Sequence, residues 1–347
     1  MKGFAMLGER KTGIIEKPNP TIRYPTDAII KVTAVAPCTT EIHALENAAI
    51  PGMIGNFIGH EAVGVIDSVG SDVKDFKPGD RVVISDVSPD WNSLEAQDQI
   101  PGRSKGCVRT SNPDMQGMFA EYVLYERADA NLARIPDNVT DQQALMVVDM
   151  IATAAAPMDF LNIQLGETVA VLGIGPVGLM GVELSVLHGA GRVFAVGSRQ
   201  ACFDAALKLG ATDCINYRKG SISKQILEQN GKPVDKVLIC GGTADILSEA
   251  LTICKTGGKI ANVAIFYDVC NDNAQILDFK HFAKDFKGFS LKSGRLFLER
   301  ALAAIQYGRL HPEYIISHVM YGFESIPEAF ELMSNKDPKM IKPVVIL

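Results

Sequence analysis

The chain lacks the cysteine pairs and basic clusters that mark several classes of protein. Its 7 cysteines include no Cys-x-x-Cys pair, and Cys107 has no second cysteine in its neighbourhood. Neither a disulfide framework nor a zinc lobe of clustered cysteines is therefore expected, and the odd number favours a reducing compartment. Lys and Arg total 34 against 40 Asp and Glu and are scattered, which argues against a groove that follows nucleic-acid phosphates.

Long apolar segments are also scarce. The N-terminal residues contain neither a long apolar run nor a cleavage site, so a secretory leader is not expected. The longest apolar stretch, Val169 to Leu187, is interrupted by four glycines, Pro176 and Glu183. This pattern fits a strand, a tight turn and a buried helix better than a membrane span. We therefore expect a cytoplasmic protein with no membrane partner and no nucleic-acid partner.

The length of 347 residues favours two domains, and the patterning changes along the chain. Short β-branched runs bounded by Gly, Pro and Asp predict strands at residues 28–35, 61–66 and 80–84. The stretch 85–118 is polar and rich in turn residues, which is typical of a long surface excursion. From about residue 165 strands, the first two at residues 168–172 and 192–196, alternate with helices, which predicts βαβ units and a doubly wound parallel sheet.

The expected fold class is α/β, with a Rossmann-type doubly wound parallel sheet in one domain and a β-rich second domain. The doubly wound domain is expected at residues 153–294, and the β-rich domain at residues 1–152 and 295–347. A helix is predicted at residues 296–307, and the apolar segment 343–347 is expected to return to the first domain as a strand.

A glycine-rich turn, Gly173–Gly178, follows a predicted strand and opens a predicted helix. Gly173 permits a tight turn, Gly175 lets the backbone approach a pyrophosphate, and Gly178 lets the helix pack closely on the strand. Pro176 and Val177 complete the motif at the start of the helix, whose N-terminus favours an anion. Such glycine turns are common, but this one lies within a βαβ series and predicts dinucleotide binding.

The end of the second predicted strand favours NADP over NAD. An NAD site usually places Asp or Glu there to bind the ribose 2′-OH, whereas this chain has Gly197-Ser198-Arg199. Glycine removes the repelling carboxylate, serine offers a hydroxyl, and arginine offers a charged fork for phosphate. The alternative interpretation is a serine N-cap followed by a solvated arginine.

Three residue types suited to zinc occur at Cys38, His60 and Asp149. Three protein ligands leave a fourth position for water or substrate, as in a catalytic zinc site. Their spacing alone does not distinguish such a site from a buried cysteine that acts as a small hydrophobe and a histidine that is an ordinary polar group.

Two segments resemble a known family. The first is the run Gly59-His60-Glu61-Ala62-Val63-Gly64, followed by Gly70 and Val73. It is similar to the zinc motif of the medium-chain alcohol dehydrogenases. The second, residues 76–82, looks like a further segment of that family. Other stretches resemble the bacterial NADP-dependent secondary alcohol dehydrogenases, at residues 1–8, 37–39, 88–91, 173–180, 196–199 and 341–346. The resemblance therefore runs nearly from end to end.

The resemblance implies a GroES-like catalytic domain with one catalytic zinc ion and no structural zinc. It implies that the zinc ligands are Cys38, His60 and Asp149. Glu61 matches an acidic neighbour that ligates the metal transiently. Thr40 matches the hydroxyl that accepts the substrate proton, and His43 continues the proton path.

The resemblance also implies how the cofactor and substrate are bound. Gly197, Ser198, Arg199 and Tyr217 match the 2′-phosphate pocket of the NADP-using branch, and Lys336 matches a further lysine linked with that cofactor. The implied activity is hydride transfer between NADP(H) and a small to medium secondary alcohol or ketone, or an aldehyde. The implied assembly is a homotetramer.

The predicted substrate wall departs from the family. Val87, Trp91 and Val108 are the candidate apolar lining, and Val108 falls where relatives carry a tryptophan that lines the pocket. A wider pocket and bulkier substrates are therefore expected. Three alternatives remain: a polyol or diol dehydrogenase of the same superfamily, a zinc-free reductase, which the three ligands count against, and a non-catalytic NADPH-binding sensor.

Overall fold

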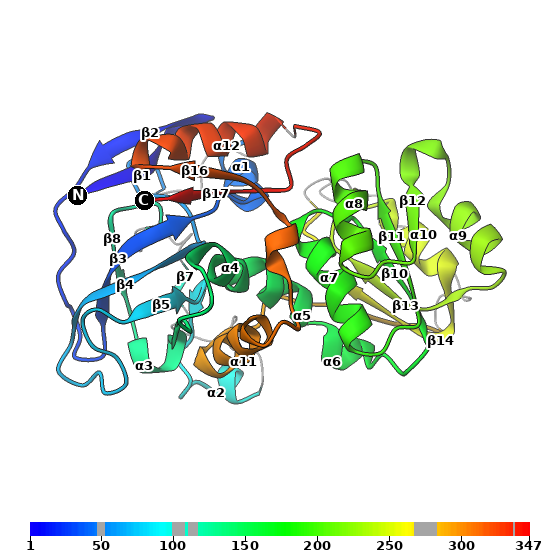
Figure 1. Ribbon diagram of the computed structural model, residues 1–347, viewed down its shortest axis with the longest axis horizontal. Coiled ribbons are helices and arrows are strands. Elements are labelled where there is room, and N and C mark those ends of the chain that lie inside the picture. Colours follow the sequence, from blue (N-terminus) through cyan, green and yellow to red (C-terminus); the bar gives the residue numbers. More distant parts are fainter. Residues whose placement is uncertain (47–52, 99–107, 110–116, 267–282, 336) are drawn as a thin grey trace. The chain divides into compact units, whose positions relative to one another are not determined.

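The computed structural model describes residues 1–46, 53–98, 108–109, 117–266, 283–335 and 337–347 (Figure 1). The chain divides into two compact units. The first unit comprises Met1–Asp149 and Lys292–Leu347, and the second unit comprises Met150–Leu291. Each unit has its own sheet and its own buried core.

The described strands of the second unit form one parallel sheet in the order β12-β11-β10-β13-β14-β15. Their bounds are Thr168–Leu172 (β10), Arg192–Gly197 (β11), Asp213–Asn216 (β12), Val234–Ile239 (β13), Cys254–Asn262 (β14) and Asp285–Gly288 (β15). The strand order reverses between β10 and β13, which is where open α/β sheets bind ligands beyond the carboxyl ends of the strands. The expected doubly wound sheet is confirmed.

Helices connect these strands and cover the sheet (Figure 1). They are α5 (Ala152–Ala155), α6 (Met158–Leu161), α7 (Pro176–Leu187), α8 (Gln200–Lys208), the short 3-10 helix Tyr217–Lys219, α9 (Ile222–Asn230) and α10 (Ile246–Ile253). Right-handed crossovers place α7 and α8 on one face and α9 and α10 on the other. Helix α7 is apolar around most of its circumference because residues 178–185 are buried, and all of β10 is buried as well.

The first unit is built around a largely antiparallel sheet in the order β16-β17-β3-β4-β5-β9, with β8 paired to β3. The bounds are Ala28–Val35 (β3), Ala62–Val69 (β4), Arg81–Ile84 (β5), Tyr122–Tyr125 (β8), Leu132–Arg134 (β9), Ile316–Tyr321 (β16) and Lys342–Ile346 (β17). Two further pairs are β1 (Lys2–Gly8) with β2 (Lys11–Glu16) and β6 (Val87–Ser88) with β7 (Val108–Arg109). Strand β17 pairs with β3 through Val345 and Val35, so the C-terminal strand returns to the first unit as predicted.

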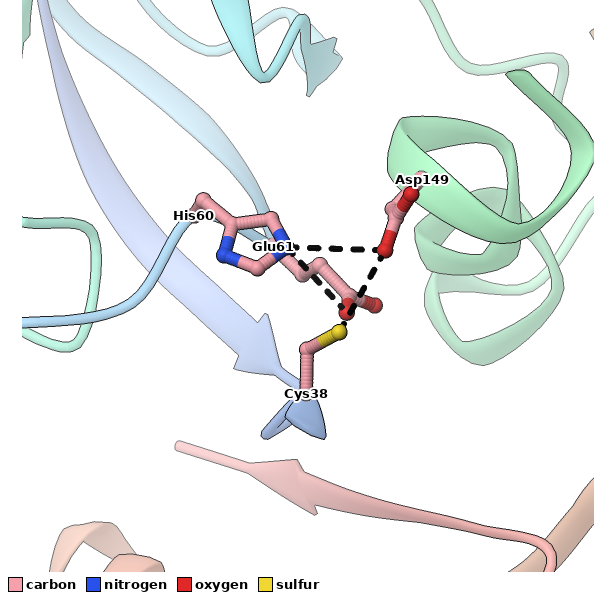
Figure 2. Close-up of side chains that lie close together, drawn as sticks. All are labelled: Cys38, His60, Glu61 and Asp149. Carbon is pink, nitrogen blue, oxygen red and sulfur yellow. Dashed lines mark hydrogen bonds and ion pairs between the residues drawn. The ribbon is translucent and has the colours of Figure 1, made fainter. Parts of the chain in front are cut away.

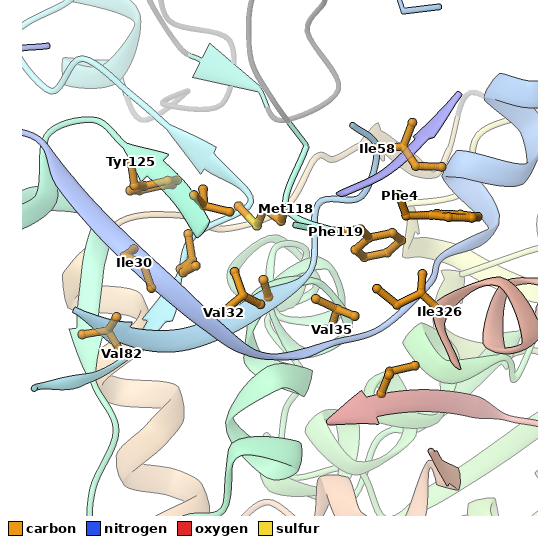
Figure 3. Packing of buried hydrophobic residues seen from close by; sticks show 14 of the residues in the cluster. Phe4, Ile30, Val32, Val35, Ile58, Val82, Met118, Phe119, Tyr125 and Ile326 are labelled. Carbon is orange, nitrogen blue, oxygen red and sulfur yellow. The ribbon is translucent and has the colours of Figure 1, made fainter. Parts of the chain in front are cut away.

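Helices and aromatic side chains complete the first unit (Figure 3). The helices are α1 (Thr39–Glu46), α2 (Leu94–Gln97), α3 (Ala128–Asn131), α4 (Asp141–Met146), α11 (Arg295–Gln306), α12 (Ile326–Asn335) and the 3-10 turns Pro312–Tyr314 and Phe323–Ser325. Phe4 and Phe330 pack with their ring centroids 5.5 Å apart, and Phe119 and Ile326 belong to the same core. Fully burying each large apolar side chain stabilises the folded state by about 1.5–3 kcal/mol relative to leaving it exposed.

The helix that leads to Asp149 starts from a well-defined cap. The Thr140 hydroxyl accepts from the Gln143 backbone at 3.2 Å, and the Gln143 side chain accepts from the Thr140 backbone at 3.1 Å, which forms a capping box. A π-helical turn, Val147–Ile151, follows α4, and such turns often occur at functional sites. The helical stretch Asp141–Leu161 is long and apolar enough to span a membrane. However, 78% of its apolar 18-residue segment is buried inside the protein, as in a core helix.

Candidate metal centre and nucleotide-binding turn

Among the described residues, four ligand-type side chains converge in the first unit (Figure 2). They are Cys38, His60, Glu61 and Asp149, all buried, and their ligand atoms lie within 4.8 Å of one another. Asp149 Oδ2 lies 3.6 Å from Cys38 Sγ and 3.5 Å from His60 Nε2. His60 Nε2 lies 3.8 Å from Glu61 Oε1. The structure thus brings together the three predicted zinc ligands and the acidic neighbour.

Local sequence explains how these side chains reach one place. Cys38 lies between β3 and α1, the pair His60-Glu61 directly precedes β4, and Asp149 lies in the π-helical turn. Gly59 has a φ of +96°, and a Cβ there would lie 2.2 Å from the ring of Phe119. Only glycine fits both constraints, so the residue before His60 has a structural reason to lack a side chain.

Glu41 orients two of these ligands, a role that was not predicted from the sequence. Its Oε1 contacts His60 Nδ1, and its Oε2 accepts from the Cys38 backbone N–H at 2.9 Å. A carboxylate on one ring nitrogen of a histidine fixes the tautomer and turns the other nitrogen toward a metal. The signal was a carboxylate three residues after a candidate cysteine ligand, in the first turn of α1.

Lys342 is a second residue that the sequence analysis missed. It begins β17, and its Nζ lies 2.5 Å from Glu61 Oε1 and donates to the Pro37 carbonyl at 2.9 Å. Glu61 and Lys342 are both completely buried. No local pattern pointed to this pair, because the two residues are 281 positions apart in the sequence.

The buried charges perturb the titration of the cluster. Burial and the nearby Asp149 carboxylate raise the pKa of the Cys38 thiol. Burial lowers the pKa of His60, but the carboxylates of Glu41 and Asp86 and the hydrogen bonds of His60 to Asp149 and Cys38 outweigh burial and raise it well above its ordinary value. Burial also raises the pKa of Glu61, although Lys342 opposes that effect. A bound divalent cation favours the deprotonated thiol, imidazole and carboxylates, so it reverses these shifts.

The donor set fits a zinc ion. Sulfur, imidazole nitrogen and carboxylate oxygen are the donors that zinc takes in catalytic sites. Among the described residues Glu61 Oε2 is buried without a hydrogen-bond partner, which is costly in the absence of a cation. Cys38, His60 and Asp149 can therefore hold the metal, with Glu61 next to it.

The two predicted proton-transfer residues lie on one helix. Thr40 and His43 are three residues apart on α1, on the same side of the helix. Thr40 is an exposed residue whose hydroxyl lies 3.6 Å from Cys38 Sγ, while His43 is half-buried. The hydroxyl of Thr40 is thus adjacent to the metal centre.

The glycine turn of the second unit follows β10 and opens α7, as predicted. Gly173 has a φ of +92°, and a Cβ there would lie 2.7 Å from the Gly241 nitrogen. A Cβ at Gly178 would lie 2.0 Å from the Gly173 carbonyl oxygen, so the helix packs directly on the turn. Gly175 is the N-cap, Pro176 occupies the first turn, and a Cβ at Gly175 would meet nothing within 4 Å. This open space at a helix N-terminus suits a phosphate group.

The end of β11 carries the predicted 2′-phosphate residues. A Cβ at Gly197 would lie 2.5 Å from the Ile174 side chain, which explains the glycine. The Ser198 hydroxyl donates to the Tyr217 hydroxyl at 2.9 Å. The N-cap of α8 is Arg199 rather than Ser198, so the N-cap interpretation of the serine is wrong. The remaining cofactor residues are Val177, in the first turn of α7, and Lys336, which lies outside the described residues.

The candidate substrate residues are placed less completely. Val87 is buried, and its strand β6 pairs with the strand that contains Val108, whose side chain is outside the described part of the structure. Trp91 donates from its indole N–H to Asn131 at 3.0 Å, and a Cβ on Gly294 would lie 2.2 Å from the Trp91 ring. Trp91 therefore has a packing role against Asn131 and Gly294.

Comparisons with known proteins agree with this geometry. Residues 24–137 match the alcohol dehydrogenase GroES-like domain, and residues 176–297 match the zinc-binding dehydrogenase family. The NADP-dependent isopropanol dehydrogenases of Thermoanaerobacter brockii and Clostridium beijerinckii are 45% and 42% identical to this chain, over 100% of each chain. Alcohol dehydrogenase TADH from Thermus sp. ATN1 has a similar structure, with a TM-score of 0.89, 26% identity and coverage of 100% of this chain and 99% of that one. The chain belongs to the zinc-dependent medium-chain alcohol dehydrogenase family, in the branch that contains NADP-dependent isopropanol dehydrogenases.

Proposed function

We propose that the protein is a zinc-dependent oxidoreductase that transfers a hydride between NADP(H) and a small to medium secondary alcohol or ketone, or an aldehyde. One observation carries the proposal: the buried convergence of Cys38, His60, Glu61 and Asp149. It occurs in a chain 45% identical along its whole length to an NADP-dependent isopropanol dehydrogenase.

The residues of the first unit have distinct roles in this proposal. Cys38, His60 and Asp149 hold the zinc ion, which when bound supplies Lewis-acid polarisation of the alcohol oxygen. Thr40, whose hydroxyl lies beside Cys38, accepts the proton of the alcohol. His43 passes that proton on from the same face of α1.

The residues of the second unit bind and select the cofactor. The backbone N–H groups at the start of α7 receive the pyrophosphate, and the open space at Gly175 leaves room for it. Ser198, Arg199 and Tyr217 bind the 2′-phosphate, and Gly197 leaves no carboxylate to repel it. The nicotinamide itself supplies the hydride chemistry, and the protein supplies position and charge.

Several finer features belong to the same proposal. The protein uses one catalytic zinc ion and no structural zinc, acts in the cytoplasm and assembles as a homotetramer. Residues 1–152 and 295–347 form the catalytic domain, and residues 153–294 form the dinucleotide-binding domain. Lys336 contributes to cofactor binding, and Val87, Trp91 and Val108 line the substrate pocket. Replacing Val108 with Trp should narrow the range of accepted alcohols, and an unchanged range would refute its place in the pocket.

The test measures reduction of the nicotinamide cofactor when the purified protein is mixed with 2-propanol or 2-butanol. NADP⁺ and NAD⁺ are compared in parallel, before and after a zinc chelator is added. The expected result is chelator-sensitive turnover that prefers NADP⁺. A C38S variant should lose turnover and still bind NADPH, because Cys38 and the glycine turn belong to different units. Full activity in C38S would contradict the metal assignment, and turnover of polyols alone would favour the diol alternative.

A further inference from the structure

Asp86 is a carboxylate near the metal centre to which the proposed function gives no role. It lies between β5 and β6, two residues after the end of β5. Among residues 82–89, Asp86 alone is not buried. A charged side chain in such a run is costly unless it reaches solvent or a polar partner. The carboxylate of Asp86 therefore faces accessible space within an otherwise buried segment.

The register of the sheet places Asp86 level with the ligand His60. Strands β4 and β5 are antiparallel, and Val63 on β4 is opposite Val83 on β5. Continued by three positions beyond this pair, the register sets Asp86 opposite His60. Residues that are directly opposite each other in an antiparallel pair have neighbouring side chains on one face of the sheet.

The electrostatics of His60 agree with this placement. Burial lowers the pKa of His60, and the carboxylates of Glu41 and Asp86 are the charges that raise it most. Cys38 and Glu41 follow β3, whereas Asp86 follows β5, and these two strands lie on either side of β4. Asp86 thus comes to the metal centre from the other neighbour of β4, together with the candidate substrate residue Val87.

The segment that carries Asp86 is fixed by a buried tyrosine. The Tyr125 hydroxyl donates to the carbonyl of Ser85 and lies 3.0 Å from the carbonyl of Val87. Tyr125 is only 1% exposed, so these contacts are shielded from water. The backbone is held on both sides of Asp86, which preorganises its carboxylate for a directional contact.

We propose that Asp86 is a specificity-determining residue that accepts a hydrogen bond from a second hydroxyl group of the substrate. An ionised carboxylate is an acceptor only, so it gains nothing from an apolar substituent. The favoured substrates are then secondary alcohols with a hydroxyl one or two carbons from the reacting carbon, and the matching hydroxyketones in the reverse direction. Val87 beside it contacts the carbon chain, since pockets combine an apolar lining with a few polar groups that fix orientation. The inference rests on the proposed function and narrows its substrate class.

The test compares 2-butanol, 2,3-butanediol and 1,3-butanediol as substrates with NADP⁺, because the three share one carbon chain. In the wild type, kcat/KM for at least one diol should exceed that for 2-butanol by about 10- to 100-fold, which corresponds to one hydrogen bond to a charged group. D86A should lose this preference. The matched control is D72A, which removes an exposed aspartate of the same unit and should keep it.

The ratio of diol to 2-butanol is the decisive quantity. If Asp86 only supported the fold or acted on His60, D86A would change all three substrates alike and keep the ratio, which would overturn the inference. Equal kcat/KM values for the three alcohols in the wild type would overturn it as well, even if D86A does not fold. No turnover of any of the three by the zinc-loaded protein would overturn the proposed function too, whereas turnover of 2-butanol without a preference for a diol would overturn the inference alone.

Discussion

The contact between Glu41 and the metal ligands gives a prediction whose size follows from the structure. Glu41 accepts from two donors at once, the His60 ring nitrogen Nδ1 and the Cys38 backbone N–H. In an E41Q variant the side chain keeps its shape but has one acceptor oxygen and one amide group that donates. One of the two donors must then face another donor, and the negative charge behind His60 is lost.

The expected loss of zinc affinity is about 10- to 100-fold. A hydrogen bond to a charged group contributes about 1.5–3 kcal/mol, and each 1.4 kcal/mol corresponds to about a factor of ten in affinity. Replacement of one charge-assisted bond by a donor–donor contact therefore predicts this range, which is also typical of outer-shell partners of metal-binding histidines. Both donors are buried, so water does not easily take the place of the missing acceptor.

The assay is a competition titration of zinc between the protein and a chromophoric chelator at fixed pH. The matched control is E324Q, which changes an exposed glutamate that pairs with Lys2 in the same unit, and its zinc affinity should equal that of the wild type. NADPH binding should be unchanged in both variants, since the glycine turn belongs to the second unit. A zinc affinity of E41Q within about threefold of the wild type would refute the outer-shell role that the distances indicate.

Three further predictions concern the second unit. G178A should lower stability by about 1–3 kcal/mol because its Cβ would lie 2.0 Å from a backbone oxygen, and equal melting temperatures of G178A and wild type would contradict this. G175A, by contrast, should keep the fold but weaken NADP⁺ binding. R199A should weaken NADP⁺ binding about 10- to 100-fold and leave NAD⁺ binding nearly unchanged, and an equal loss for both cofactors in a binding titration would exclude a phosphate contact. The hydrogen bonds of Arg192 lower the pKa of Asp213, so this pair stabilises the fold above about pH 4 and its contribution is lost as the pH falls further. D213N should cost under about 1 kcal/mol in urea unfolding at neutral pH, with the difference shrinking in acid, and a difference that grows in acid would reverse the sign of this linkage.

The sequence predicted the local elements of the second unit well because apolar periodicity and glycine turns are short-range signals. The strand predicted at residues 168–172 is β10, and the strand predicted at 192–196 differs from β11 by one residue. The helix predicted at 296–307 in the first unit is α11, shifted by one residue. Strand β15 was not predicted, because all of its residues are exposed and it has no apolar alternation.

The candidate site was predicted less evenly. The spacing of Cys38, His60 and Asp149 was compatible with zinc but did not select these residues, and the family resemblance supplied that selection. The role of Glu41 had a local signal, its place three residues after Cys38, whereas Lys342 was missed because its contact with Glu61 is one that no sequence period encodes. Lys342 in particular reaches Glu61 only because β17 pairs beside β3, which ends close to Cys38.

The neighbouring residues His60 and Glu61 are held by buried partners of opposite charge. His60 is bound from behind by the carboxylate of Glu41, which leaves its Nε2 as the atom that faces Asp149. Glu61 is bound through Oε1 by the ammonium of Lys342, and the same oxygen lies 3.8 Å from His60 Nε2. A negative partner strengthens a histidine as a ligand. Residues 60 and 61 therefore place a histidine that its partner favours as a ligand next to a carboxylate that is already paired with a cation.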